Sequence, residues 1–356
     1  MITLFVSEPV VAVTVEGLYK SSVIVSSREN ERVRRQGFST ALQQVLVKVT
    51  GRRDVLELGA VRRAVANPES YVEFWEYTTF KPEPSPPGTP ADAIGQADRI
   101  QLLVTFFAPQ IQSLLEQNSI PVWPENRPAT LVWMVVQEEL GPRQIGSVER
   151  HADLLREMNS LADSRGVPLL MPLLDVEDQR AISAEQIWNL EADAIHQASA
   201  RYQTDSVLVV RLFRSLGGEL LGTAAFYFRN GIRTADFYGE DLSSVMARPV
   251  DLVAEELSAY YAVLASGAEV LVNMTVEGID SVKDYAGLMS YVQKLVDVNK
   301  VTLVRADQQT LDLTLSTGGQ IRQLIEAIAL DRNLRPVTDA VRENNVVLMH
   351  YQWVAP

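Results

Sequence analysis

The N-terminal part of the chain combines two spacings of hydrophobic residues, one typical of strands and one of helices. Val13–Val25 alternates apolar and polar positions and predicts a half-buried strand. Arg28–Val49 carries apolar residues at helical spacing, and Gly51 follows as a residue suited to a left-handed helix cap. Two further strands are predicted on either side of a proline-rich segment, Lys81–Pro90: Tyr71–Phe80 and Arg99–Phe107. We therefore expect a first α+β module over residues 1–128.

Strands and helices alternate in the next part of the chain, residues 129–266. Such alternation predicts βαβ units around a parallel sheet. The turn signals Gly217-Gly218 and Asn230-Gly231 then predict an antiparallel meander, closed by a helix over Leu242–Leu264. The alternating elements expected before the meander are strand Thr130–Val136, helix Val148–Ser164, strand Pro168–Leu174, helix Ser183–Tyr202 and strand Ser206–Phe213.

The last part of the chain, residues 267–356, predicts the order β-α-β-β-α-β of a ferredoxin-like module. The chain as a whole is thus expected to be of mixed α+β and α/β class, with three small modules. The elements predicted in the third module are strand Glu269–Gly278, helix Ser281–Val296, strands Lys300–Ala306 and Leu311–Ser316, helix Gly319–Ala329 and strand Val346–Trp353.

Composition excludes several classes of protein. With 47% hydrophobic and 22% charged residues, the chain is able to build packed cores. Its 32 basic and 45 acidic residues give a formal charge of −13, which disfavours a nucleic-acid partner. The absence of cysteine excludes thiol catalysis, disulfides and cysteine-ligated metals. The sequence also lacks the glycine-rich phosphate-binding motifs, so no cofactor is predicted.

No catalytic residues are predicted either. The nucleophile motif G-x-S-x-G is absent, and the three histidines, His151, His196 and His350, lack the H-E-x-x-H spacing of a zinc site. We expect two of them on amphipathic helices and the third in a terminal strand, as surface or core residues.

One cluster of carboxylates is a candidate for chemistry or recognition. Asp175, Glu177 and Asp178 follow the predicted strand Pro168–Leu174, at the end where open α/β sheets place their ligands. They are able in principle to hold a divalent cation or to act as an acid–base pair. The alternative is a helix cap and solvated turn.

Basic and aromatic residues supply the other candidates for recognition. Arg28, Arg32 and Arg35 share one face of the predicted helix and suit an anionic partner, unless they form a solvated face. Trp123 and Arg127 lie in the turn between the first two modules. They are expected to anchor a rigid linker or to line a ligand site.

The N-terminal residues suggest a trace of an export signal. The sequence contains no run of about 18 apolar residues, so it predicts no transmembrane helix. Val10 and Ala12 fit the positions before a signal-peptidase cleavage site, although a basic region is missing. Two interpretations stay open: the tail of a signal peptide whose start lies upstream, or a first strand.

Several segments in combination resemble one family. They are ALQQVLVKVTGRRDVL, NPESYVEFWEY, PVWPENRPATLVWMVV, RGVPLLMPLLDVED and ASARYQTDSVLVVRL. The chain resembles an uncharacterised proteobacterial group known as domain of unknown function 2066. Its middle module is also similar to the N-terminal domain of the periplasmic translocation protein of the Tol system. These resemblances imply a binding protein of the cell envelope and carry no catalytic residues.

The expected function is that of a non-enzymatic adaptor or assembly-accessory protein that binds another protein in the periplasm or envelope. If the N-terminus is not a signal, the location is cytoplasmic. Two alternatives stay open: a small-ligand or glycan sensor with its ligand near Trp123 and Arg127, and an enzyme that uses Asp175, Glu177 and Asp178. The sequence leaves the partner and the oligomeric state undetermined.

Overall fold

The computed structural model consists of helices and several small mixed sheets, which confirms the predicted α+β class. It describes residues 12–80, 99–229, 231–262, 270–295, 298–307, 309–317, 321–331, 333–343 and 346–354. The chain divides into a small unit, Glu16–Val122, and a large unit, which comprises Met1–Val15 and Trp123–Pro356. The proline-rich Lys81–Pro90 and most of the signal-like N-terminus lie outside the described residues.

The small unit consists of a three-stranded antiparallel sheet and the helix α1, which packs against it. The Asn30 side chain caps the start of α1, and Gly51 ends it in the left-handed conformation (φ 73°). Helix and sheet approach closely at Gly37, where a Cβ would lie 2.7 Å from the side chain of Leu102. The elements are β2 (Lys20–Val25), α1 (Glu31–Thr50), 3₁₀ turns at Asp54–Glu57 and Pro68–Tyr71, α2 (Gly59–Ala66), β3 (Val72–Phe80), β4 (Arg99–Phe106) and α3 (Ala108–Gln117), with sheet order β2-β4-β3.

Two predicted boundaries at the start of the chain are wrong. The expected strand Val13–Val25 is two strands, because Gly17 adopts a left-handed conformation (φ 67°) and turns the chain between them. The first of these, β1 (Ala12–Thr14), pairs with β5 (Asn126–Pro128) in the large unit. The predicted helix also starts too early, since its cap leaves Arg28 outside α1.

The large unit contains a six-stranded sheet with helices on both faces. Its strand order is β11-β10-β9-β6-β7, and β8 pairs with β6 on the same side as β7. β6 runs parallel to β8 and β9, whereas β9, β10 and β11 form the predicted antiparallel meander. The strands are β6 (Thr130–Glu138), β7 (Arg143–Ile145), β8 (Leu169–Leu170), β9 (Ser206–Arg214), β10 (Leu220–Phe228) and β11 (Gly231–Gly239).

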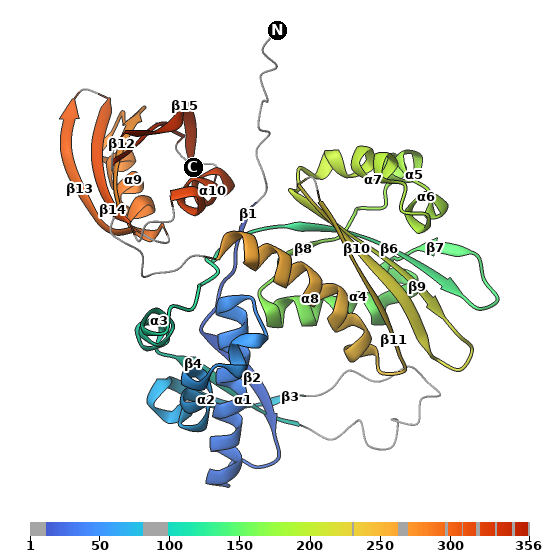
Figure 1. Cartoon of the computed structure of the whole chain (residues 1–356). Coiled ribbons are helices and arrows are strands. Elements are labelled where there is room, and N and C mark those ends of the chain that lie inside the picture. The colour runs from blue at the N-terminus through green and yellow to red at the C-terminus, as the bar shows by residue number, and fades with distance from the viewer. Residues whose placement is uncertain are drawn as a thin grey trace. The chain divides into compact units, whose positions relative to one another are not determined.

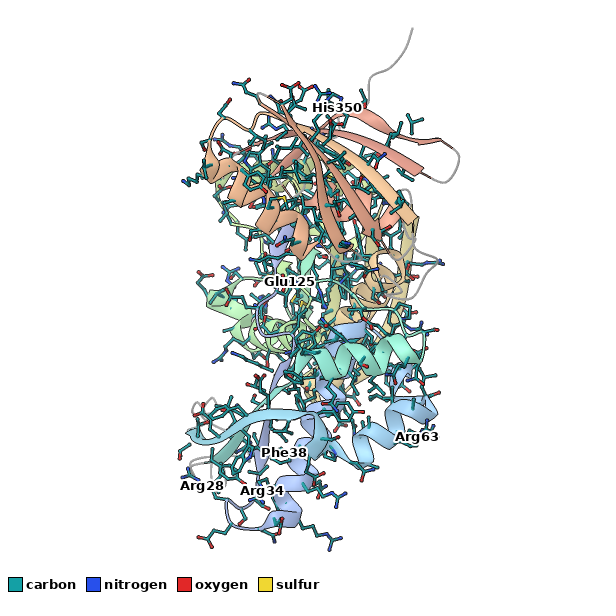
Figure 2. All side chains as sticks on the ribbon, turned by 90° about the vertical axis from the view of Figure 1, so that its left-hand side faces the viewer. Arg28, Arg34, Phe38, Arg63, Glu125 and His350 are labelled. Atoms are coloured by element: carbon teal, nitrogen blue, oxygen red, sulfur yellow. The ribbon has the colours of Figure 1, made fainter. Side chains whose placement is uncertain are left out.

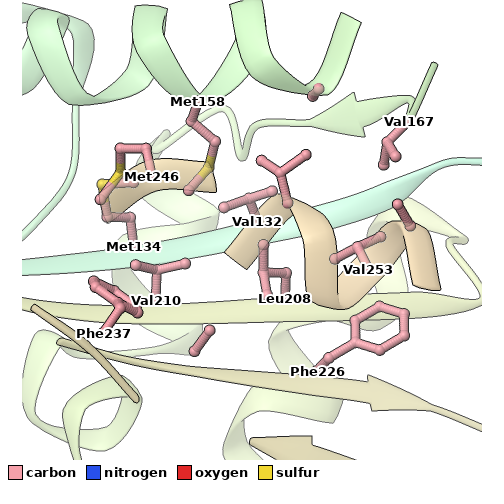
Figure 3. Close-up of a cluster of buried hydrophobic side chains, with 14 of the residues drawn as sticks. Val132, Met134, Met158, Val167, Leu208, Val210, Phe226, Phe237, Met246 and Val253 are labelled. Carbon is pink, nitrogen blue, oxygen red and sulfur yellow. The ribbon is translucent and has the colours of Figure 1, made fainter. Parts of the chain in front are cut away.

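Two layers of helices bury the two faces of this sheet, as expected for parallel strands. In Figure 1, α4 (Val148–Arg165) and α8 (Leu242–Tyr261) lie below the sheet and α5 (Val176–Ala181), α6 (Ala184–Trp188) and α7 (Ala192–Ser199) lie above it. Alternate residues of β6 therefore enter different cores. Figure 3 shows the core on the side of α4 and α8, where Val132, Met134, Met158, Leu208 and Met246 meet. The opposite core contains Leu131, Trp133, Val209, Ile187 and Ile195.

Two predicted elements of this unit are much shorter in the structure. The strand expected over Pro168–Leu174 pairs with β6 only at Leu169–Leu170. The helix expected over Ser183–Tyr202 is interrupted after Trp188, and Leu190 has a positive φ of 56°, which no helix accommodates. None of the helices within the described ranges has the length and apolar character needed to span a bilayer.

The C-terminal part of the large unit forms a five-stranded sheet, and the predicted boundary near residue 266 falls in the undescribed segment 263–269. The sheet departs from the ferredoxin-like pattern, because an additional strand, β15, forms a hairpin with β16 and leaves β16 parallel to β12. Pro336 and the charged residues of β15 hide its alternation, as is typical of an edge strand. The elements are β12 (Val270–Glu277), α9 (Val282–Lys294), β13 (Val298–Asp307), β14 (Thr310–Thr317), α10 (Ile321–Leu330), β15 (Leu334–Glu343) and β16 (Val346–Trp353), with strand order β13-β14-β12-β16-β15.

Helix α4 contains a buried histidine at a distorted position. His151 is 3% exposed and departs from helical geometry (φ −130°, ψ 39°). Burial lowers the pKa of His151, and the carboxylates of Glu138 and Asp153 oppose this effect while Arg214 and Arg150 reinforce it. The imidazole is therefore neutral in the folded protein near pH 7.

This burial predicts a loss of stability in mild acid. As the pH falls below about 6.5, His151 takes up a proton in the unfolded chain before it does so in the folded one, so the free energy of unfolding decreases by up to about 1.4 kcal/mol per pH unit. We expect His151→Gln to reduce the difference in urea midpoint between pH 7.5 and 5.5. Equal pH dependence in wild type and His151→Gln would contradict this assignment.

Candidate functional site

A groove of about 670 Å³ lies in the large unit, beside β6. It opens where β8 leaves the sheet, at the carboxyl end of the parallel pair β6–β8, the end at which α/β sheets place ligands. Apolar and polar side chains share its lining. The apolar ones are Val132, Met134, Ile145, Leu155, Met171, Pro172, Leu173, Leu174 and Ile182, and the polar ones are Arg143, Gln144, Ser147, Glu149, Arg150 and Gln179. Leu173 at its wall is 70% exposed, and Val148 at the start of α4 is 71% exposed.

The groove exists because the ladder between β6 and β8 stops early. Pro172 has no backbone N–H, so it cannot continue the hydrogen bonds that Leu169 and Leu170 begin. Within residues 99–229, the edge of β6 then has no strand partner until the Met134 carbonyl accepts a hydrogen bond from the Gly146 N–H (2.8 Å). Val132 (1% exposed) and Met134 (2% exposed) of this stretch of β6 line the groove.

The wall of the groove is held by a network around Asp178. This carboxylate is 1% exposed and accepts hydrogen bonds from the Leu174 N–H (2.8 Å) and the Tyr202 hydroxyl (2.5 Å). The guanidinium of Arg201 donates to Asp178 (2.9 Å) and, through both terminal nitrogens, to Asp175 (2.8 and 3.0 Å). Leu174 itself has a positive φ of 54°, a conformation that a branched side chain adopts only when its surroundings impose it.

The electrostatics of the network match its geometry. The hydrogen bonds from Arg201 hold the pKa of the Asp175 carboxyl well below its usual range, with a further contribution from the Asp178 N–H. Burial, together with the hydrogen bond to Asp178, raises the pKa of Tyr202 to about 12. Asp175 also caps α5, since it accepts hydrogen bonds from the N–H groups of Glu177 and Asp178 (both 3.0 Å).

The three predicted carboxylates therefore do lie together, but they surround the guanidinium of Arg201, a cation of the chain itself. Asp175 and Asp178 are committed to Arg201, and Glu177 lies exposed, 3.6 Å from the same guanidinium. Among the described residues, no group of three or more His, Asp or Glu side chains is arranged to hold a metal ion. This geometry gives Asp175 and Asp178 a positioning role at the groove wall.

Trp123 and Arg127 lie inside the large unit, and both are 0% exposed. The Arg127 guanidinium lies 4.0 Å from the centre of the Trp123 ring. It also donates to the carbonyl oxygens of Arg165 (3.2 Å) and Gly166 (2.7 Å) at the end of α4, where a cation is favourable. These two residues thus hold the chain segment around Trp123 against the end of α4, and neither faces an open site.

Of the three predicted basic residues of the small unit, Arg32 and Arg35 lie on α1, three residues apart, whereas Arg28 precedes the helix. Arg28, before α1, donates to the Thr79 hydroxyl (2.6 Å), whereas Arg35 pairs with Glu69 (3.1 Å). Arg32 is exposed. Arg34, which the sequence analysis did not select, lies over the ring of Trp75 (5.2 Å), and Figure 2 shows its side chain near Arg28 at the start of α1.

Sequence reasoning missed the opposite wall of the groove. β7 supplies Arg143, which pairs with Glu185 and lies 4.4 Å from the centre of the Trp188 ring. β7 has only three residues and no alternation to reveal it. Pro172, directly after an apolar run, was the available signal that the strand ends there.

Comparison with known proteins adds no activity. A family model described as a domain of unknown function (DUF8605) matches residues 12–124. No curated protein matches the chain. A solved structure described as "Crystal structure of uncharacterized protein" is 10% identical, covers 38% of this chain and 91% of its own, and gives a TM-score of 0.17.

These findings correct the family resemblance. An uncharacterised domain is present, as expected, but the matching model is DUF8605 rather than domain of unknown function 2066. The match spans the small unit, Glu16–Val122, with a few residues on either side, and leaves the groove outside it.

The network predicts unequal effects for two neighbouring carboxylates. Asp178→Ala leaves the Leu174 N–H and the Tyr202 hydroxyl without their acceptor, so the free energy of unfolding should fall by about 1–3 kcal/mol. Glu177→Ala removes only an exposed ion pair and should change it by less than about 0.5 kcal/mol. Urea unfolding of both variants measures the difference. Equal effects would mean that Asp178 does not hold the groove wall.

Proposed function

We propose that this chain is a non-enzymatic adaptor that binds an extended, apolar segment of another protein in the groove beside β6. The observation that carries the proposal is the groove itself: a channel with apolar side chains along one wall, next to a stretch of β6 that has no strand partner within residues 99–229. Extended segments bind such sites with their backbone at a sheet edge and alternate side chains in pockets.

The rim of the groove favours a peptide over a small molecule. A small-ligand site surrounds most of its ligand, whereas Leu173 and Val148 extend into solvent here and offer contacts to a chain that runs out of the groove. A small-ligand sensor at the same groove is the second candidate, because about 670 Å³ is also a volume that such ligands occupy.

Two exposed leucines allow a controlled test. Leu173 lines the groove, and Leu140 is 87% exposed in the turn between β6 and β7, outside it. A photo-crosslinking amino acid at each position, introduced in cells, should give a defined protein adduct at 173 and none at 140. Mass spectrometry of the adduct then identifies the partner segment.

The segment, made as a peptide, should bind Leu173→Asp about 10-fold more weakly than wild type, because a charge replaces one apolar contact worth about 1.4 kcal/mol. Leu140→Asp should bind as wild type does. Equal adducts at both positions, or equal binding by both variants, would contradict a peptide groove. A small molecule recovered with the purified chain and displaced by Leu173→Asp would favour the sensor.

The same proposal places the adaptor in the periplasm or envelope of a bacterium. Its support is the apolar N-terminal sequence with Val10 and Ala12 at positions that signal peptidase accepts. Fractionation of cells that express the protein from its native locus should recover it with periplasmic markers, with Val13 as the first residue. Recovery with cytosolic markers and an intact Met1 would contradict this location.

A further inference from the structure

The far edge of the six-stranded sheet is an unusually regular strand. β11 pairs with β10 over nine consecutive residues, from Gly231 opposite Phe228 to Gly239 opposite Leu220, without a register shift. Its register is fixed by Gly222 of β10, since a Cβ there would lie 2.4 Å from the ring of Phe237 and 2.7 Å from the Arg211 carbonyl oxygen. Among the described strands, none pairs with the outer edge of β11, which therefore presents a long row of backbone groups in a fixed position.

Other sheet edges in the described chain carry features that discourage pairing. β13 and β15 have register shifts, β15 also contains Pro336, and β3 has a shift near its start. β7 is three residues long, and β2 is six residues long and begins with Lys20. Bulges, proline, lysine and shortness are among the means by which proteins block edge pairing, and β11 has none of these four, although it carries two charged residues, Arg233 and Asp236.

The side chains of β11 are also suited to pairing with another strand of the same sequence. Ile232 is 55% exposed and Tyr238 is 84% exposed, and both lie on the sheet face opposite Arg233, which pairs with Glu256 of α8 (3.3 Å). Single exposed apolar residues are ordinary, but two on one face of an open edge strand form a site for another strand.

Charge restricts how two β11 strands are able to pair. In an antiparallel pair related by a two-fold axis, directly opposed residues lie on one face of the sheet. An axis through Arg233 or Asp236 would place each of these charges opposite its own copy, which is unfavourable. An axis through Thr234 would place Ile232 opposite an aspartate.

An axis through Ala235 avoids all of these conflicts. It places each Ile232 opposite Tyr238 of the second copy and each Thr234 opposite Asp236 of the second copy. Asp236 already accepts a hydrogen bond from Thr223 (2.8 Å) on that face, and its carboxylate has capacity for another.

We propose that two copies of this chain join β11 to β11, antiparallel, about a two-fold axis through Ala235. The interaction extends one sheet across both copies. It is independent of the groove, which lies at the opposite side of the sheet, beside β7 and β8. A dimer of this kind would present two grooves to its partner and so bind a bivalent target more tightly.

Substitutions at Thr234, an exposed position, test both the dimer and its register. Thr234→Asp places aspartate opposite Asp236 twice and should weaken dimerisation about 10-fold, whereas Thr234→Lys places lysine there and should preserve the dimer. Sedimentation equilibrium of the full chain measures the association, and circular dichroism confirms that both variants fold. Because the chain has no cysteine, Ala235→Cys should also form a disulfide-linked dimer under mild oxidation.

Three results would overturn the proposal. A wild-type chain that stays monomeric at its highest soluble concentration excludes the dimer. Dimers that persist equally in Thr234→Asp and Thr234→Lys must use another surface. Equal dissociation of both variants rules out the register through Ala235.

Discussion

The buried carboxylate of Asp178 is the contact on which the groove depends. A carboxylate out of water is costly unless every lone pair meets a donor. Here Arg201, Tyr202 and the Leu174 N–H supply those donors. The same bonds keep the chain after β8 away from β6, because they hold Leu174 in a backbone conformation that it would not otherwise adopt. Together with Pro172, which ends the β6–β8 ladder, this arrangement leaves β6 without a strand partner beside the groove within residues 99–229.

Elements with strong periodicity were predictable from the sequence, and elements set by tertiary contacts were not. Val346–Trp353 has the predicted bounds, because its alternating side chains define it locally, and the meander forms around the two predicted turns. β8 is short because of Pro172 and the network beyond it, and the helix predicted up to Tyr202 breaks at Leu190. Pro172 was a local signal for the end of β8, whereas the break at Leu190 has no such signal in the sequence.

The candidate site was predictable in its residues but not in their role. Asp175 and Asp178 were identified from their place after a strand. The sequence does not show that Arg201, more than twenty positions further on, lies between them. Arg127 shows the same limit. The sequence placed it in a linker, whereas the structure places it at the end of α4 as a buried cation. In both cases a contact with a distant part of the chain decides whether a polar side chain is available to a ligand.

The groove and the β11 edge suggest how the two proposals combine. Both are openings of a single sheet, one where a strand ends early and one where no further strand is added. A protein that presents two such openings is suited to connect other chains.

The most direct test of the central claim is methyl NMR of the methionines, titrated with the partner segment that crosslinking identifies. Met134 and Met171 line the groove, whereas Met274 and Met349 lie in the core of the five-stranded sheet. We expect the resonances of Met134 and Met171 to shift in proportion to binding while those of Met274 and Met349 stay in place. Shifts confined to Met274 and Met349, or binding that leaves Met134 and Met171 unmoved, would contradict the account.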